Sequence, residues 1–220
     1  HEPDNRVLLR DLAELLANKG EFDRAAHYYR LILEKEGGGD PGIEKAIAEL
    51  ELRKIDARLE ALDPSAADFA VECDRLRREK IEFQLRECQK RAERYPHDLG
   101  ISFELGQLYL QGGKTSEAIR EFQKAVNHPN RRIAAMKHLG QCFLQRGMND
   151  LAARRFQEAL KEKPAFDDEK KDLLYLLGTV LDAMGRRDEA LEQFKQIYEV
   201  DIGYRDVSDK IDAYYQQTTC

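Results

Sequence analysis

The residue types that most often supply catalytic or metal-binding groups are sparse in this 220-residue chain. Beyond the first residue there are four histidines, His27, His97, His128 and His138. They do not form the H-E-x-x-H pair of a zinc-dependent hydrolase, and no C-x-x-C pair accompanies them. Gly37 to Gly39 is not followed by the lysine and threonine of a phosphate-binding loop, and no G-x-S-x-G nucleophile elbow occurs. The sequence therefore predicts no catalytic residue, no metal ion and no cofactor.

The cysteines do not indicate a disulfide framework. Their positions are Cys73, Cys88, Cys142 and Cys220. They are too widely spaced for a metal-binding knuckle and too few for a disulfide-rich fold, so we expect reduced thiols. Cys142 lies two residues after Gly140, and we expect it to pack as a small apolar side chain.

Composition limits the partners. The chain is 42% hydrophobic and 35% charged with a net charge of −6, whereas non-specific binders of nucleic acid or anionic membranes are basic. We interpret the arginine pairs as solvated surface: Arg131-Arg132, Arg154-Arg155 and Arg186-Arg187. No run of 18 apolar residues and no signal-peptide core occurs, so we expect no direct membrane insertion. We expect a cytoplasmic protein, or alternatively the soluble domain of a membrane-tethered or larger protein.

One size pattern occurs three times between Leu99 and Asp201. The copies are Leu105-Gly106-x-x-Tyr109 with Ala118 and Phe122, Leu139-Gly140-x-x-Phe143 with Ala152 and Phe156, and Leu177-Gly178-x-x-Leu181 with Ala190 and Phe194. The successive glycines are 34 and 38 residues apart, which suits one helix-turn-helix unit per copy. We expect the glycines and alanines to let two antiparallel helices approach, while the large residues fill the remaining space.

Each copy also contains turn residues. Gly113, Gly147 and Gly185 stand where a helix C-terminus needs a left-handed residue. Ser116, Asp150 and Asp188 follow them, and we expect these residues to be the N-caps of the second helices.

These features together resemble the tetratricopeptide repeat family. The resemblance implies an all-α, right-handed helical-repeat solenoid. In this family the first helices of the repeats line a concave groove that holds peptide segments of partner proteins. It therefore implies a protein-binding module rather than an enzyme.

The resemblance also implies which side chains line the groove. They are Phe103, Gln107, Leu110 and Gln111 in the first copy, Lys137, Gln141, Leu144 and Gln145 in the second, and Tyr175, Thr179 and Asp182 in the third. Glutamine amides both donate and accept hydrogen bonds, so they suit a peptide backbone, and Phe103 and Tyr175 would be anchors. The lysine, arginine and asparagine clamp of co-chaperone members is absent. Lys137 alone could pair with a carboxylate of a partner.

The rest of the chain divides into three segments. Residues 1–36 read as a degenerate repeat, with Leu12-Ala13-x-x-Leu16, Gly20, Asp23, Ala25 and Tyr29 in the repeat register. Residues 37–98 read as an inserted long helical hairpin whose second half resembles part of a fused repeat. Residues 99–201 hold the three full repeats, and residues 202–220 are a C-terminal capping helix and tail, with Val207, Ile211 and Tyr214 or Tyr215 facing inward.

Aspartates mark several expected helix starts. Asp40-Pro41 and Asp63-Pro64 each pair an N-cap with a proline at the first helical position, and Asp167 or Asp168 is expected to cap the helix that follows. From Ser65 to Tyr95 we expect one helix of about 30 residues, roughly 45 Å long. In the hairpin's first helix, a 4-3 spaced seam faces one partner helix: Ala48, Leu52, Ile55, Leu59 and Leu62.

Three functions remain open from the sequence. The leading one is a non-enzymatic adaptor or scaffold that binds a protein or peptide partner in the groove. The second is a self-assembling structural scaffold, a homo-oligomer formed through the repeats or the 41–95 hairpin. The third is the docking or regulatory part of a larger enzyme, which we consider because the chain begins at His1 rather than at methionine.

Overall fold

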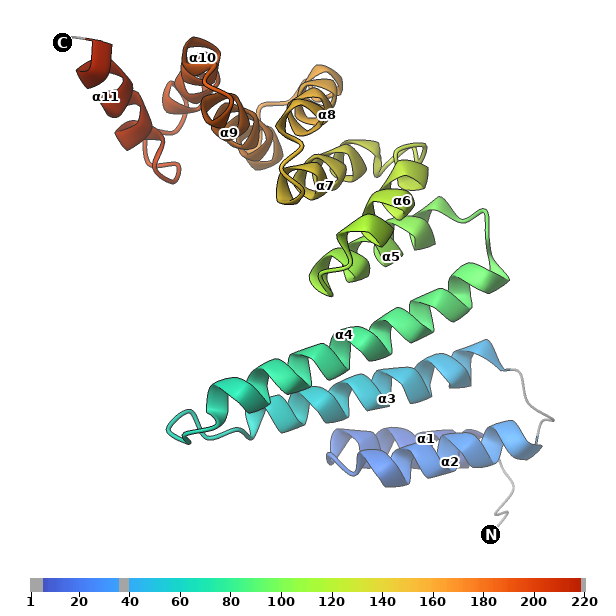
Figure 1. The fold of residues 1–220 in the computed structure, drawn as a ribbon. Helices are drawn as coiled ribbons and strands as arrows, with labels where there is room; N and C mark the ends of the chain where they lie inside the picture. The colour runs from blue at the N-terminus through green and yellow to red at the C-terminus, as the bar shows by residue number, and fades with distance from the viewer. Residues whose placement is uncertain (1–5, 36–39, 219–220) are drawn as a thin grey trace. The chain divides into compact units, whose positions relative to one another are not determined.

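A computed structural model describes residues 6–35 and 40–218, and all of the regular secondary structure in these ranges is helical (Figure 1). The helices are α1 (Arg6–Asn18), α2 (Phe22–Lys35), α3 (Pro41–Glu60), α4 (Phe69–Arg94), α5 (Leu99–Gln111), α6 (Thr115–Ala125), α7 (Arg132–Gln145), α8 (Asn149–Glu162), α9 (Asp168–Ala183), α10 (Arg187–Tyr198) and α11 (Val207–Thr218). The chain forms two compact units, one up to Glu87 and one from Cys88 onward, so the division falls inside α4.

The first unit is built on a pair of helices followed by a long hairpin. A turn at Gly20, with φ of +80°, joins α1 to α2, and α3 packs against α2. Ala13, Ala25 and Tyr29 are buried in the resulting core, as their places in the repeat register predict. The long helices α3 and α4 run antiparallel (Figure 1), and two ion pairs connect them: Arg58 with Glu79, and Lys80 with Asp56.

The two expected Asp-Pro helix starts behave differently. Asp40 caps α3, and its Oδ1 accepts hydrogen bonds from the backbone N–H groups of Gly42 and Ile43. Asp63 caps no helix, so that prediction is wrong. Its Oδ1 instead accepts from the N–H and the hydroxyl of Ser65, and this local Asx turn delays the helix start. As a result α4 begins at Phe69 and has 26 residues rather than about 30.

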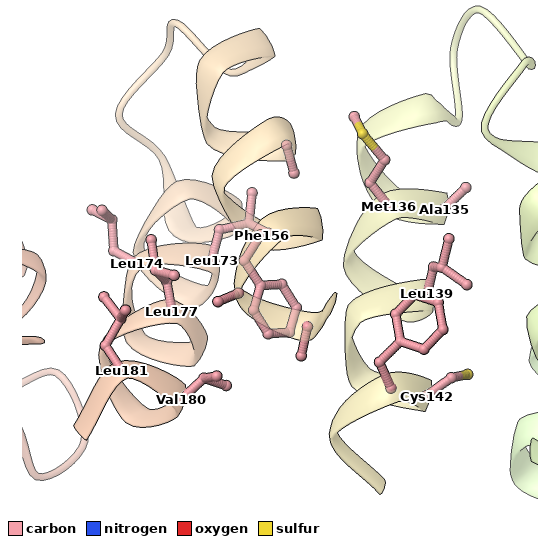
Figure 2. Packing of buried hydrophobic residues seen from close by; sticks show 14 of the residues in the cluster. Ala135, Met136, Leu139, Cys142, Phe156, Leu173, Leu174, Leu177, Val180 and Leu181 are labelled. Atoms are coloured by element: carbon pink, nitrogen blue, oxygen red, sulfur yellow. The ribbon is translucent and has the colours of Figure 1, made fainter. Parts of the chain in front are cut away.

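In the second unit, α5–α6, α7–α8 and α9–α10 are the three helix pairs of the size pattern. A Cβ atom added to Gly140 would lie 2.5 Å from Cε1 of Phe156, and equivalent contacts join Gly106 to Phe122 and Gly178 to Phe194. The space that each glycine leaves is thus filled by the phenylalanine ring of its own repeat. Figure 2 shows Phe156 in the apolar layer that also contains Leu139 of α7 and Leu173 of α9.

The turns within the repeats confirm the glycines and correct the caps. Gly113, Gly147 and Gly185 have φ of +72°, +70° and +75°. The expected caps Ser116, Asp150 and Asp188 each lie one residue inside a helix that starts earlier, and Asp23 does the same in α2. The reason is visible at Lys114, whose N–H donates to the carbonyl of Tyr109 at 2.8 Å. This bond leads the chain into the second helix directly after the glycine.

Two aspartates cap first helices, and the last helix closes the second unit. Asp98 caps α5, which the sequence analysis did not anticipate, and Asp167 caps α9 as expected. On α11, Val207 and Ile211 are buried as predicted. Of the two tyrosines, Tyr214 is the half-buried one, and its hydroxyl donates to Asp188 of α10.

The cysteines of the described chain are free and buried: Cys73, Cys88 and Cys142. Burial raises the pKa of the Cys142 thiol to about 11. The fourth, Cys220, lies outside the described residues. Within residues 6–35 and 40–218, no helix combines the length and apolar character needed to cross a membrane.

Candidate peptide-binding surface

Three polar side chains form a hydrogen-bonded row across the first helices of two repeats. Gln107 of α5 approaches His138 of α7, with 3.5 Å between its Nε2 and the histidine Nε2. His138 Nδ1 lies 2.9 Å from Oε1 of Gln141, one turn further along α7. The amide oxygen can only accept, so His138 carries its proton on Nδ1 and accepts from Gln107 at Nε2. The row therefore requires a neutral imidazole.

The ring of His138 is held from below as well as from its sides. It stacks on Phe122 of α6 with 5.1 Å between ring centroids and an interplanar angle of 18°, and it also contacts Phe103. Burial lowers the pKa of His138, and the neighbouring Lys137 ammonium acts in the same direction. The bond to Gln141 and the more distant Asp172 carboxylate oppose this shift, but burial is the largest cause.

This lowered pKa predicts a pH-dependent stability. The unfolded chain has an ordinary histidine pKa near 6.5, so on acidification it takes up the His138 proton before the folded chain does. The stability that neutral His138 contributes is complete above pH 6.5 and is lost as the pH falls below that value. We expect urea unfolding at pH 7.5 and 5.5 to show a larger loss for the wild type than for His138→Gln. Equal losses in the two proteins would contradict this expectation.

Leucines and further glutamines flank the row. Leu110 and Leu144 are half-buried, and Gln111 and Gln145 are exposed, all near the C-terminal ends of α5 and α7. The Thr115 hydroxyl of α6 donates to Oε1 of Gln145 at 3.1 Å, which orients that amide. This part of the surface combines apolar area with fixed amides.

The two expected aromatic anchors are both covered. Phe103 is only 5% exposed, packs against Phe122, and lies beneath the guanidinium of Arg131 at 5.0 Å from its ring centroid. Tyr175 lies beneath the guanidinium of Arg205 at 4.5 Å. The arginines come from the connections that precede α7 and α11. Phe103 is therefore part of the core, and Tyr175 offers a partner little of its ring face.

The tyrosine is also hydrogen-bonded within the unit. The Tyr175 hydroxyl donates to Asp206 at 2.8 Å, and the Thr179 hydroxyl donates to the carbonyl of Tyr175 at 2.9 Å. Burial, and then the bond to the Asp206 carboxylate, raise the pKa of Tyr175. On α9, only Asp182 of the three expected groove residues is exposed.

Lys137 is engaged in an internal ion pair. Its Nζ lies 3.2 Å from Oδ2 of Asp172, and both side chains are only 20% exposed. The other oxygen of Asp172 accepts from Arg205 at 2.6 Å. Asp172 thus links α7, α9 and the connection before α11, and Lys137 is not a lone cation waiting for a partner.

The structure therefore brings Gln107 and Gln141 together and joins them through His138, which the expected groove set did not include. A sequence signal for His138 exists, because it lies 31 residues after Gln107, close to one repeat length. Arg131, Arg205 and Asp172 had no such signal. Within the described residues, no group of three or more histidine, cysteine, aspartate or glutamate side chains is placed to hold a metal ion.

Comparisons with known proteins agree with this architecture. Among solved structures, a crystal structure of MamA matches with a TM-score of 0.58 and 21% identity, covering 67% of this chain and 84% of that one. A second MamA crystal structure matches with a TM-score of 0.53 and 20% identity, covering 88% and 90%. At such identities the likeness concerns the fold alone. No curated protein sequence matches significantly.

The family assignment comes from the sequence itself. Two family models, each described as tetratricopeptide repeat, match residues 103–165 and residues 172–201. These ranges cover the helices that carry Gly106, Gly140 and Gly178 with their phenylalanine partners. Over these residues the chain is a tetratricopeptide-repeat protein.

Proposed function

We propose that this protein is a non-enzymatic adaptor that binds a segment of another protein along the first helices of its repeats. Tetratricopeptide repeats are protein-interaction modules, and the row of Gln107, His138 and Gln141 is the observation that carries the proposal. The binding surface, as proposed, centres on α5 and α7 and extends to Thr179 and Asp182 of α9.

The row suits a peptide backbone. Gln141 accepts the His138 proton with its Oε1, which leaves its Nε2 group to donate to a ligand. Gln107 donates to His138, which leaves its Oε1 to accept. One donor and one acceptor on neighbouring helices match the C=O and N–H groups of an extended chain, whatever its side chains. Leu110 and Leu144 beside the row would bury an apolar side chain of the partner.

The charges on this surface favour a partner segment that needs no acidic terminus. Lys137 is already paired with Asp172, and the exposed Asp182 adds a negative charge. We infer a peptide with an apolar residue for the two leucines and no requirement for a carboxylate.

The repeat organisation that supports this surface is also a proposal. We propose that residues 1–36 are a degenerate repeat, residues 37–98 a long helical hairpin, residues 99–201 three full repeats and residues 202–220 a capping helix and tail. In this organisation the proposed surface lies within the three full repeats.

A displayed random-peptide library tests the function directly. Peptides selected on the wild-type chain are expected to bind Gln141→Ala and Leu144→Asp at least about tenfold more weakly, because each change removes one of the recognition elements. Gln123→Ala is the matched control, since Gln123 is an exposed glutamine on the second helix α6. Its affinity is expected to equal that of the wild type. Circular dichroism confirms that each variant is folded.

Two results would contradict the proposal. One is a library that yields no specific binder to the wild-type chain. The other is a set of binders whose affinity is the same for the wild type, Gln141→Ala and Leu144→Asp, because such peptides must bind elsewhere.

A further inference from the structure

An apolar stripe lies uncovered on α1. Leu8, Leu12 and Leu15 follow the 4-3 spacing of one helix face, and they are 56%, 38% and 59% exposed. The opposite side of the helix packs on α2 through buried Leu9, Ala13 and Leu16. Three exposed leucines on one face form a contiguous patch, which is unlike the scattered apolar residues of an ordinary surface.

The repeat register shows what this face is for. With Leu12-Ala13 aligned on Leu139-Gly140 and on Leu177-Gly178, the stripe corresponds to two fully packed sets, Ala135, Leu139 and Cys142 on α7 and Leu173, Leu177 and Val180 on α9. None of these six side chains is more than 3% exposed. In α7 and α9 the second helix of the preceding repeat packs there, α6 in one case and α8 in the other. The stripe on α1 is therefore a helix-packing face that lacks its helix within the described chain.

The stripe is close to self-complementary. Leu12 has Leu8 four residues before it and Leu15 three residues after it, about 6 Å and 4.5 Å along the axis at 1.5 Å per residue. If a second copy lies antiparallel with Leu12 opposite Leu12, each Leu8 faces a Leu15. No charged side chain interrupts the three leucines, so no charge meets its own copy at the centre. Such an isologous contact closes after two chains.

We propose that α1 is a dimerisation helix, and that Leu8, Leu12 and Leu15 pack against the same stripe of a second copy of this chain in antiparallel orientation. The proposal does not depend on peptide binding by α5 and α7. It moves self-association from the 41–95 hairpin seam to α1, because Ile55 and Leu76 of that hairpin are already buried.

Sedimentation equilibrium across the micromolar range tests the proposal. The wild-type chain is expected to show a monomer–dimer equilibrium. Leu8→Lys and Leu15→Glu alone are each expected to weaken dimerisation by about tenfold or more, because a charge then faces a leucine. Lysine and glutamate have helix propensities close to that of leucine, so α1 persists. Val71→Lys is the matched control, because Val71 is a 66% exposed apolar residue on α4 outside the stripe.

Mixing the two variants identifies the antiparallel arrangement. A Leu8→Lys chain and a Leu15→Glu chain would place a lysine opposite a glutamate at one contact and two leucines at the other. The mixture is therefore expected to dimerise more tightly than either variant alone. A wild-type chain that stays monomeric overturns the proposal, as do variants that dimerise like the wild type or folded variants that show no rescue on mixing.

Discussion

Phe156→Ala is expected to lower the free energy of unfolding of the second unit by about 3–5 kcal/mol, the usual cost of removing a fully buried aromatic ring. Phe156 has no exposed surface and fills the space beside Gly140 between two repeats (Figure 2). The surrounding layer is built from rigid helices, so it can close the cavity only in part. Urea unfolding followed by circular dichroism gives the change.

Gly140→Ala tests the same contact from the other side. On propensity alone, alanine in a helix is better than glycine by about 1 kcal/mol. Here the new Cβ would lie 2.5 Å from Cε1 of a ring that has no free space to move into, so we expect a net loss of stability. In the Phe156→Ala background the clash is absent, and the same substitution is expected to stabilise.

The four proteins of this double-mutant cycle control one another. A change of sign for Gly140→Ala between the two backgrounds is the expected outcome, and it isolates the glycine–phenylalanine contact from helix propensity. Additive effects would show that the ring relaxes freely, and the packing described for all three repeats would then be wrong.

Asp172→Ala is the second large effect, with an expected loss of about 2 kcal/mol, because hydrogen bonds between charged groups are stronger than neutral ones. The substitution removes the acceptor of both Lys137 and Arg205. Lys137 is only 20% exposed, so its ammonium would be left partly buried without that carboxylate. Urea unfolding of the two proteins measures the loss.

Glu192→Ala provides the matched control for Asp172. Glu192 pairs with Lys195 on the exposed side of α10, where the two side chains are 65% and 37% exposed. Such a surface pair contributes about 0–1 kcal/mol. If Asp172→Ala costs no more than Glu192→Ala, the three-part link between α7, α9 and the connection before α11 is not a stabilising element.

Local features of the chain were readable from the sequence. Glycines with positive φ at Gly113, Gly147 and Gly185 were predicted correctly, because only a few backbone atoms and the absent Cβ determine that preference. The 34- and 38-residue intervals and the Leu-Gly and phenylalanine positions were enough to indicate repeats. The caps were misplaced because the turn's hydrogen bond from Lys114 to Tyr109 starts the second helix earlier than the polar residues suggest.

The candidate site depended on more distant contacts. Arg131 covers Phe103, Arg205 covers Tyr175, and Asp172 pairs with Lys137, and each pair joins residues about one repeat apart. A sequence pattern indicates which face a residue occupies, but not which side chain from the next repeat reaches it. For that reason two expected anchors and one expected cation proved to be engaged inside the unit.

The sequence alone determined the helical repeats of this protein, because helix periodicity, small residues and turn glycines act over a few neighbouring positions. Only the tertiary structure decided which of these helices were complete. Leu8, Leu12 and Leu15 read like Leu173, Leu177 and Val180 in the sequence, yet the first set is exposed and the second is buried. Burial depends on whether another helix packs on that face, and the residues of the face itself do not encode its presence.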